Sequence, residues 1–328
     1  MHRWAVLGAG GWGTAFALLL ADAGREVTLW SRRPEQVAEI NHQHTNRTRL
    51  AGVELPRTIT AAGDAGTAVA AADAVVVALP AQTVRGNLTG LDLPPVPVLS
   101  LAKGLEVGTG LRMSEVLVDC GVDPARIAAL SGPNLADEIG RREPASAVIA
   151  ASDHDLAVAL QQGCHGPNFR PYSSVDLVGV EVGGATKNAI AVAVGMAIGL
   201  GVGANSIAAL ITRGLAETTR LGEALGADPL TFSGMAGMGD LVATCFSPLS
   251  RNRTFGEQLG RGLPAAEAQA RGRGVVEAVR STPAIADLAA RYRVDMPIVA
   301  AVCEVLRGDL TPEDGMRRTM ERAAKPER

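Results

Sequence analysis

The sequence has 328 residues, of which 47% are hydrophobic and 20% are charged. This composition is that of a globular chain long enough for two domains with substantial cores. The net charge of −3 provides no global positive field, which argues against nucleic acid as the main partner.

The cysteine and histidine patterns predict neither a metal nor a redox centre. Cys120, Cys164, Cys245 and Cys303 are widely separated and form no CxxC pair. We therefore expect free thiols in a reducing cytoplasm. The five histidines include no HExxH motif, so we expect no bound metal.

The first half of the sequence predicts strands that alternate with helices. Residues 1–8 are typical of a strand, and the glycines at 10–13 follow where the apolar core of a signal peptide would continue. Ala-rich helical segments such as residues 14–23 and 34–41 lie between the apolar runs. The predicted strands are residues 4–7, 26–30, 74–79, 96–101, 127–130 and 147–150.

Continuous apolar strands of this kind indicate a parallel sheet that helices cover on both faces. The fold class predicted for the first half is therefore a Rossmann-like, doubly wound α/β sheet. In such sheets ligands bind at the carboxyl ends of the strands. Five residues stand where predicted strands end: Gly8, Ser31, Pro80, Lys103 and Ser131.

After about residue 178 the periodicity becomes helical. We expect a dinucleotide-binding domain at residues 1–178 and an all-helical substrate and catalytic domain at residues 179–328. Residues 189–204 carry no charge, and we interpret them as a buried core helix and not as a membrane span. Helix breaks are predicted at residues 226–229, 260–264, 281–283 and 293–297.

A glycine motif follows the first strand. Gly8, Gly10 and Gly13 match GxGxxG, with Gly11 and Trp12 between the last two. The first glycine permits a tight turn, the second a close approach of a pyrophosphate, and the third close packing of helix on strand. The helix then points its N-terminal amides at the phosphates. A structural turn is the alternative, but the position between strand and helix favours a dinucleotide site.

The end of the second strand bears on the choice of cofactor. An NAD site usually has Asp or Glu there, whereas this sequence has Arg32 and Arg33, with no acid before Glu35. Arginine can pair with the 2′-phosphate of NADP. The pattern favours NADPH, with use of NAD also possible; a solvated basic turn is the alternative.

Lys187 lies among small and apolar residues in Gly-Gly-Ala-Thr-Lys-Asn, at 183–188. Burial of an ammonium is costly unless it has a partner or a role, and desolvation would lower its pKa and make it a usable proton donor. A lysine whose charged end reaches solvent at a helix surface explains the residue equally well.

Residues 237–253, which contain Gly-Asp-Leu-Val-Ala-Thr-Cys and then Ser-Arg-Asn, extend this pattern. Together with the Lys187 segment they closely resemble the NAD(P)-dependent glycerol-3-phosphate dehydrogenases of bacterial type. The resemblance continues through Ala-Lys-Gly-Leu-Glu at 102–106, Ser-Gly-Pro-Asn at 131–134, Val-Val-Glu at 275–277 and Met-Pro-Ile at 296–298. It thus covers nearly the whole chain in order.

The resemblance implies reduction of dihydroxyacetone phosphate to sn-glycerol 3-phosphate, the precursor of membrane glycerophospholipids, by NADPH or NADH. It also implies a cytoplasmic homodimer without membrane insertion. Hydride addition creates an alkoxide, which a lysine ammonium would stabilise and protonate. The implied catalytic residues are Lys187 as proton donor or acceptor, Lys103, Asp240 and Thr244. The implied substrate-binding residues are Lys103, Gly132, Asn134, Lys187, Asp240, Ser250, Arg251 and Asn252. The implied cofactor contacts are Gly8, Gly10, Gly11, Trp12, Gly13, Arg32, Arg33, Lys103, Ala136, Arg251, Val275 and Glu277.

Some residues depart from the family pattern, and some dehydrogenase classes do not fit. Asn134 stands where the bacterial branch usually has Ser or Thr, although an amide can still donate and accept a hydrogen bond. Ala51 replaces a common proline. The sequence has no Tyr-x-x-x-Lys pair and no convincing catalytic histidine. A 6-phosphogluconate-type 3-hydroxyacid dehydrogenase and a cofactor-sensing regulator without turnover remain as alternatives.

Overall fold

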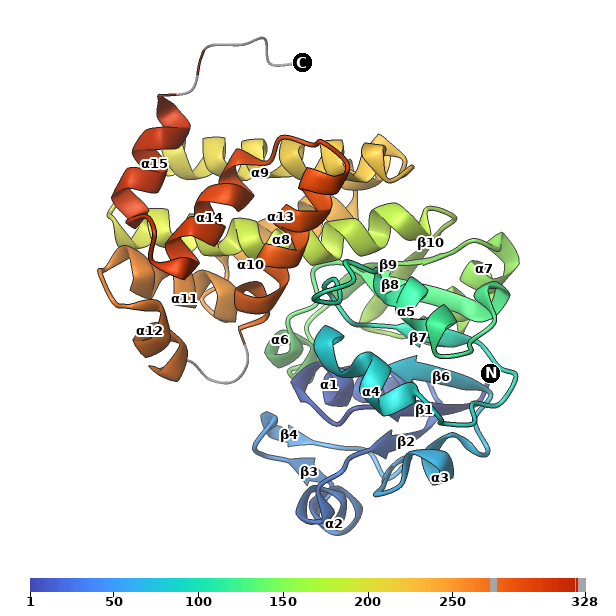
Figure 1. Ribbon diagram of the computed structural model, residues 1–328. Helices are drawn as coiled ribbons and strands as arrows, with labels where there is room; N and C mark the ends of the chain where they lie inside the picture. The colour runs from blue at the N-terminus through green and yellow to red at the C-terminus, as the bar shows by residue number, and fades with distance from the viewer. Residues whose placement is uncertain (272–275, 322, 324–328) are drawn as a thin grey trace.

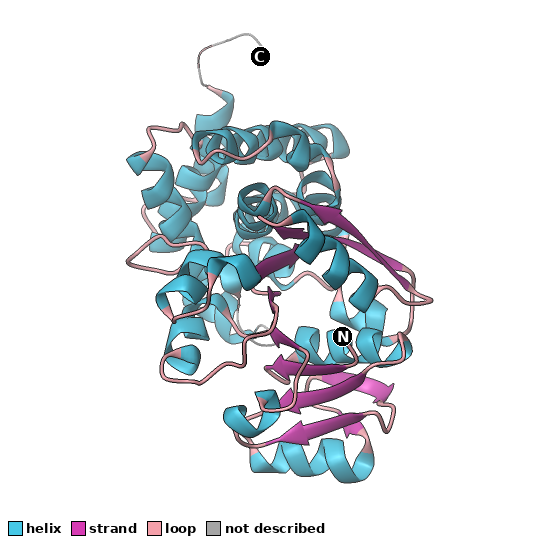
Figure 2. Cartoon of the chain, turned by 90° about the vertical axis from the view of Figure 1, so that its right-hand side faces the viewer, coloured by secondary structure: helices cyan, strands magenta, loops and turns pink. Residues whose placement is uncertain are grey.

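The computed structural model describes residues 1–271, 276–321 and 323. A twisted sheet with helices on its faces forms one part of the molecule, and a group of helices forms the other (Figure 1). The view turned by 90° shows the strands following one another through the lower part, toward the helices above (Figure 2).

The main sheet has eight strands in the order β10-β9-β8-β7-β6-β1-β2-β5. The chain therefore leaves β1 toward β2 and β5, and then crosses back to place β6 on the other side of β1. Such a reversal creates a crevice at the carboxyl ends of the two central strands. The strands are β1 Arg3–Leu7, β2 Glu26–Trp30, β5 Ile59–Ala62, β6 Ala74–Val77, β7 Val98–Ser100, β8 Ile127–Ser131, β9 Ala145–Ala151 and β10 Phe169–Ser174.

Both faces of the central strands are buried, as their continuous apolar runs predict. In β1, Trp4 and Val6 pack into one core and Ala5 and Leu7 into another. The helices that cover the faces are α1 Gly11–Asp22, α2 Pro34–Gln43, α3 Ala65–Val69, α4 Val84–Leu88, α5 Met113–Asp119, α6 Ala136–Gly140 and α7 His154–Cys164.

The sheet is not parallel throughout, which corrects one detail of the prediction. β8 pairs with β9 in the antiparallel sense, and β10 then lies parallel to β9. Apolar composition does not distinguish the two directions of pairing. The sequence also gave no clear signal for β5, for β10, or for the small antiparallel pair β3 Thr45–Asn46 and β4 Leu50–Glu54, because these strands are short or largely polar.

After β10, the described residues form helices and no further strand. They are α8 Leu177–Gly199, α9 Ala204–Ala224, α10 Asp240–Phe246, α11 Arg251–Gly260, α12 Ala265–Arg271, α13 Glu277–Arg291, α14 Pro297–Arg307 and α15 Pro312–Met320. A 3₁₀ segment at Pro229–Ser233 and a π-helical turn at Met235–Gly239 precede α10. β10 ends at Ser174 and α8 begins at Leu177, so strands give way to helices between these two residues.

Helix α8 lies at the centre of this part. It is long and apolar enough to cross a membrane by length and composition, but 83% of its most apolar window is buried inside the protein. Helix α11 packs so closely on it that a Cβ at Gly195 would lie 2.1 Å from the Arg253 carbonyl oxygen. Residues 189–197 of the uncharged stretch are therefore core, as predicted. Residues 198–204 are half-buried or exposed, and the stretch is not one helix, because α8 ends at Gly199 and α9 begins at Ala204.

The break predicted at residues 281–283 is wrong. Pro283 lies inside α13, which continues to Arg291. Two hydroxyls bond to carbonyls one turn earlier: Ser281 Oγ donates to Glu277 O over 3.0 Å and Thr282 Oγ1 to Ala278 O over 2.6 Å. The helix also buries Ile285, and this packing holds it together across the proline.

Candidate active site

The glycine turn between β1 and α1 has the geometry of a dinucleotide cradle. Gly8 has a φ of +124°, and a Cβ on Gly13 would lie 1.9 Å from the Gly8 carbonyl oxygen, so a side chain at either position is excluded. A Cβ on Gly10 would meet no atom within 4 Å. The turn is thus closed toward the sheet and open at Gly10, at the N-terminus of α1, where phosphate oxygens can approach the amides.

The other expected cofactor residues of the first part surround this turn. Arg32 and Arg33 are exposed immediately after β2. Ala136, at the start of α6, lies 3.9 Å from the position of a Cβ on Gly11. Trp12 packs edge-on against Phe16, and its buried indole Nε1 has no hydrogen-bond partner in the protein. The residues present therefore fit a dinucleotide.

Lys103 follows strand β7, which lies between β6 and β8 in the sheet, and its side chain extends to the end of β8. Its Nζ donates to the Gly132 carbonyl oxygen over 2.9 Å and to Asp240 Oδ2 over 2.6 Å. β1, β6, β7 and β8 are parallel, so Gly8, Lys103 and Ser131 lie at the same edge of the sheet. This is the edge at which open α/β sheets bind ligands.

Helix α8 brings Lys187 to this edge. Glu181, six residues earlier on α8, fixes the helix to the first part: it accepts from Ser114 N over 2.7 Å and pairs with the Arg112 guanidinium over 2.7 Å. The lack of a side chain at Gly184 also permits close contact with β8, because a Cβ there would lie 2.7 Å from Ser131 Oγ. A lysine one turn further is therefore held above the strand ends.

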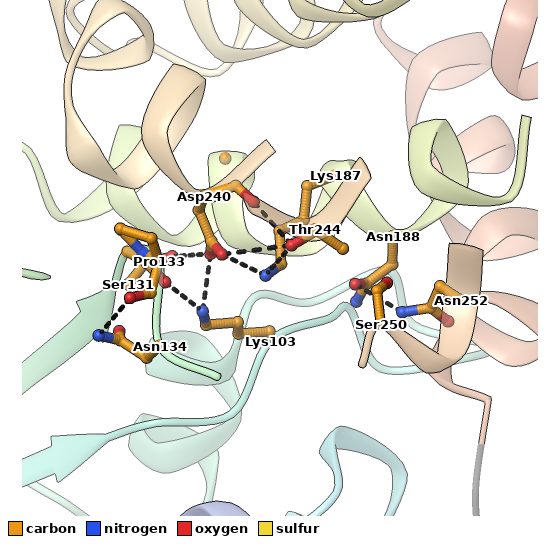
Figure 3. Close-up of polar contacts among 12 residues, drawn as sticks. Lys103, Ser131, Pro133, Asn134, Lys187, Asn188, Asp240, Thr244, Ser250 and Asn252 are labelled. Carbon is orange, nitrogen blue, oxygen red and sulfur yellow. Dashed lines mark hydrogen bonds and ion pairs between the residues drawn. The ribbon is translucent and has the colours of Figure 1, made fainter. Parts of the chain in front are cut away.

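Asp240 connects the two lysines (Figure 3). Lys187 Nζ donates to Asp240 Oδ1 and, over 2.9 Å, to Thr244 Oγ1. Lys103 binds the other carboxylate oxygen, which also accepts from Ser131 Oγ over 3.3 Å. Asp240 is 1% exposed and Lys187 8%. Four residues that the sequence singled out thus form one buried cluster, together with Ser131.

Burial and the neighbouring charges set the protonation of this cluster. Burial is the main cause that lowers the pKa of Lys187, to about 8; Lys103 lowers it further and Asp240 opposes both. Burial by itself raises the pKa of Asp240, but Lys103 and Lys187 outweigh this effect and the net pKa is lowered. The carboxylate therefore stays ionised, whereas Lys187 can give up or take a proton near neutral pH.

Asn134 offers an acceptor at the same edge. Its Nδ2 donates to the carbonyl oxygens of Pro133 over 3.1 Å and of Ser146 over 3.3 Å. Its Oδ1 is buried and has no partner in the protein. The protein therefore uses the donors of this amide, and only its acceptor remains to contact a ligand, which differs from a Ser or Thr that could do both.

A second cluster connects α8 with α11 (Figure 3). Asn252 Nδ2 donates to Asn188 Oδ1 over 2.8 Å, and Asn252 Oδ1 accepts from Ala278 N over 3.2 Å. Ser250 is buried and caps the N-terminus of α11, since its Oγ accepts a hydrogen bond from Arg253 N. This cluster contains Ser250 and Asn252 of the expected phosphate segment, and it depends on Asn188, the residue after Lys187.

Arg251, between them, is exposed, and its charge acts on Glu277 at the start of α13. Burial raises the pKa of Glu277, while Arg251 and then Arg280 lower it. The two expected cofactor contacts from the second part, Arg251 and Glu277, are thus electrostatically coupled. Val275 was also expected there and lies outside the described residues.

Ser131 and Asn188 were not among the catalytic or binding residues expected from the sequence. Ser131 had a signal as the end of a predicted strand, and Asn188 stands beside Lys187. No group of three or more His, Cys, Asp or Glu side chains that could hold a metal ion occurs among the described residues. The thiol of Cys245, next to Thr244, is buried, and burial raises its pKa to about 12.

The chain is similar to known proteins over nearly its whole length. Residues 3–157 match the family profile described as the NAD-dependent glycerol-3-phosphate dehydrogenase N-terminus, and residues 176–317 match its C-terminus. A glycerol-3-phosphate dehydrogenase [NAD(P)+] of Thermobifida fusca is 54% identical, over 100% of this chain and 99% of its own. One of Streptomyces griseus is 53% identical, over 99% and 98%. The crystal structure of glycerol-3-phosphate dehydrogenase from Coxiella burnetii superposes with a TM-score of 0.91 at 34% identity, over 98% and 99% of the two chains.

Proposed function

The chain belongs to the NAD-dependent glycerol-3-phosphate dehydrogenase family and is an NAD(P)-dependent oxidoreductase; on this premise we propose that it reduces dihydroxyacetone phosphate to sn-glycerol 3-phosphate with Lys187 as proton donor. The observation that carries the proposal is the buried Lys187–Asp240–Lys103 cluster at the edge of the sheet where the glycine turn opens.

NAD(P)H, when bound, supplies a hydride to the C2 carbonyl carbon of the substrate. The electron pair of the C=O bond moves to oxygen as the new C–H bond forms. Lys187 Nζ then gives its proton to that oxygen and becomes a neutral amine, which regains a proton from water. A pKa lowered to about 8 makes both states accessible near neutral pH.

Asp240 orients the two lysines, since it binds both ammonium groups and is held by Ser131. Lys103 adds a second positive charge near the developing alkoxide and keeps the pKa of Lys187 low. Thr244 fixes the direction of the Lys187 side chain. Gly132 contributes the carbonyl that holds Lys103.

The rest of the substrate would contact Asn134 and the start of α11. Asn134 Oδ1 has no partner in the protein and could accept a hydrogen bond from the free hydroxyl of dihydroxyacetone phosphate. Arg251 suits the phosphate dianion, because a guanidinium can donate two parallel hydrogen bonds. Ser250 and Asn252 hold this arginine at the first turn of α11.

For the cofactor we propose NADPH in preference to NADH. Arg32 and Arg33 are exposed directly after β2, where they could pair with the 2′-phosphate of NADPH, and no acidic residue stands at that strand end. We further propose a cytoplasmic homodimer, without membrane insertion, whose product is a precursor of membrane glycerophospholipids; the burial of α8 within the fold agrees with the absence of insertion.

The test is loss of absorbance of the reduced nicotinamide, with dihydroxyacetone phosphate as substrate, compared with unphosphorylated dihydroxyacetone and with a 3-oxo acid. We expect turnover with the phosphorylated ketone alone, and faster with NADPH than with NADH. Turnover only with the 3-oxo acid would indicate a 6-phosphogluconate-type enzyme. Nucleotide binding without any turnover would indicate a regulatory protein.

A further inference from the structure

A buried group of polar side chains lies directly beneath the glycine turn. Thr14, Ser31, Gln36 and Asn46 come from α1, the end of β2, α2 and β3, and they are 0%, 6%, 7% and 0% exposed. Burial of four polar side chains is costly unless they are fully hydrogen-bonded. No atom of the catalytic cluster contacts them through any described hydrogen bond, so their function is separate.

The two amides of this group converge on one backbone atom. Gln36 Nε2 donates to the Ala9 carbonyl oxygen over 2.7 Å, and Asn46 Nδ2 donates to the same oxygen over 3.1 Å. The amides also bind one another, Gln36 Nε2 to Asn46 Oδ1 over 3.0 Å. Ala9 is the residue between Gly8 and Gly10, so the amides hold the turn at its centre.

The remaining contacts fix the amides themselves. Asn46 Nδ2 also donates to Thr14 Oγ1 over 2.8 Å, in the first turns of α1. Ser31 Oγ donates to Gln36 Oε1 over 2.5 Å and accepts from Arg33 N over 3.2 Å. The network therefore joins the glycine turn to the strand end that carries Arg32 and Arg33.

The consequence follows from peptide geometry. In a trans peptide the C=O and the following N–H point in opposite directions. The two donors on Ala9 O therefore turn the Gly10 N–H away from the amides. The turn is also open at this residue, since a Cβ on Gly10 would meet no atom within 4 Å. A preorganised donor saves the ordering cost that a mobile turn would incur on binding.

The β3–β4 pair keeps Asn46 in place. Arg49 N donates to Asn46 O over 3.0 Å, and the Arg49 carbonyl oxygen lies 3.0 Å from the position of a Cβ on Gly11. This short excursion between α2 and β5 thus packs against the start of α1. It brings a side chain from 37 residues further along the chain to Ala9.

We propose that Gln36 and Asn46 are positioning residues for the dinucleotide, which act by fixing the Ala9–Gly10 peptide so that the Gly10 amide faces the pyrophosphate. The inference rests on the proposed NAD(P)H site but not on the substrate. Neither amide bonds Arg32 or Arg33 directly, and the pair would act on the cofactor through the backbone of the turn, so it should affect NADH and NADPH alike.

The test uses Asn46→Ala and Gln36→Met, with Asn41→Ala as the matched control. Asn41 also lies on α2 and bonds a strand backbone through both amide atoms, Nδ2 to Ala61 O over 3.0 Å and Ala61 N to Oδ1 over 2.7 Å, but it does not touch the turn. All three variants are expected to lower the thermal midpoint. Titration of nicotinamide fluorescence without substrate then measures Kd for NADH and for NADPH.

We expect Asn46→Ala and Gln36→Met to raise both Kd values by the same factor, roughly 5- to 30-fold, with kcat at saturating cofactor nearly unchanged and Asn41→Ala at the parental Kd. Parental Kd values in both turn variants would overturn the inference, as would a loss confined to NADPH, which would assign the pair to the 2′-phosphate instead. If Asn46→Ala does not fold, Gln36→Met alone decides. Failure of the unsubstituted chain to bind either nucleotide would instead contradict the proposed function.

Discussion

Lys103 follows a strand of the sheet and Lys187 lies on a helix of the second part, yet their ammonium groups bind opposite oxygens of one buried carboxylate, that of Asp240. Two cations and one anion leave the cluster with a net positive charge when both lysines are protonated. Under the proposed function that charge would stabilise the alkoxide, and it makes the protonation of Lys187 sensitive to each neighbour.

Removal of the Lys187 amine should abolish the chemical step and spare nucleotide binding. Lys187→Ala deletes the proposed proton donor, whereas the glycine turn lies on the other part of the molecule. We expect kcat to fall by about 10²–10⁴-fold, with the Kd of NADPH nearly unchanged. Steady-state kinetics and a fluorescence titration measure the two quantities. A loss below about tenfold in kcat would contradict a general acid.

The rates of ketone reduction and of alcohol oxidation should both depend on the protonation of Lys187, and they should change with pH in opposite directions. Reduction needs the ammonium form of Lys187, so its rate should fall as pH rises through about 8, whereas oxidation of glycerol 3-phosphate needs the amine and should rise there. Lys103 lowers the pKa of Lys187, and Asp240 raises it. Lys103→Met should therefore move the falling limb to higher pH, and Asp240→Asn to lower pH. Shifts in the same direction for both variants would refute this electrostatic account.

Cofactor preference should depend on the two arginines after β2. Replacement of Arg32 and Arg33 by Gln removes the charges that a 2′-phosphate would meet, and leaves the glycine turn intact. We expect the KM for NADPH to rise and that for NADH to stay within about twofold; each lost charged hydrogen bond is worth about 1.5–3 kcal/mol. Equal losses for the two cofactors would show that these side chains do not recognise the 2′-phosphate.

Arg251→Ala should raise the KM for dihydroxyacetone phosphate, because a phosphate dianion loses two parallel charged hydrogen bonds. The expected loss of kcat/KM is on the order of 10- to 100-fold or more, and lysine should rescue it only in part. Unphosphorylated dihydroxyacetone is the control, since it should react poorly with both proteins and change little. Equal losses for both substrates would assign Arg251 to the cofactor or to the fold.

Glu217 should make stability depend on pH through a carboxyl group outside the Lys187–Asp240–Lys103 cluster. It is 2% exposed and accepts from Ile298 N over 2.8 Å and Val299 N over 3.3 Å at the start of α14. Burial raises its pKa to about 7, although the two amides oppose this. The folded state therefore binds the proton more tightly than the unfolded state, whose pKa is near 4.5, so this stabilising contribution is complete below pH 4.5 and is lost as pH rises to about 7.

Glu217→Gln lacks this titration. We expect its free energy of unfolding in urea, relative to that of the parent, to increase between about pH 5 and pH 8, because only the parent loses stability there. Glu223→Gln, an exposed change on the same helix, should show no such trend. A difference between Glu217→Gln and the parent that is independent of pH would mean that the carboxyl titrates normally in the folded protein.

The sequence by itself determined the features that depend on neighbours in the chain. Period and composition predicted β1, α1 and the other buried strands, because a strand buried on both faces must be apolar throughout. The Gly8–Gly13 spacing was decisive for the turn, since a Cβ on Gly13 would meet the Gly8 carbonyl oxygen only five residues earlier. The motifs around Lys187 and Asp240 pointed to the family, which the comparisons confirmed.

Only the tertiary structure decided which of these residues meet. Lys103 and Asp240 are 137 residues apart, and the contact of Asn46 with Ala9 depends on a short polar hairpin that no periodicity predicts. The persistence of α13 through Pro283 and the reversed direction of β9 likewise follow from packing, because propensity yields where enough apolar surface is buried. The lowered pKa of Lys187 belongs with these: burial and the Lys103 charge lower it, Asp240 opposes them, and the two charges come from different segments of the fold.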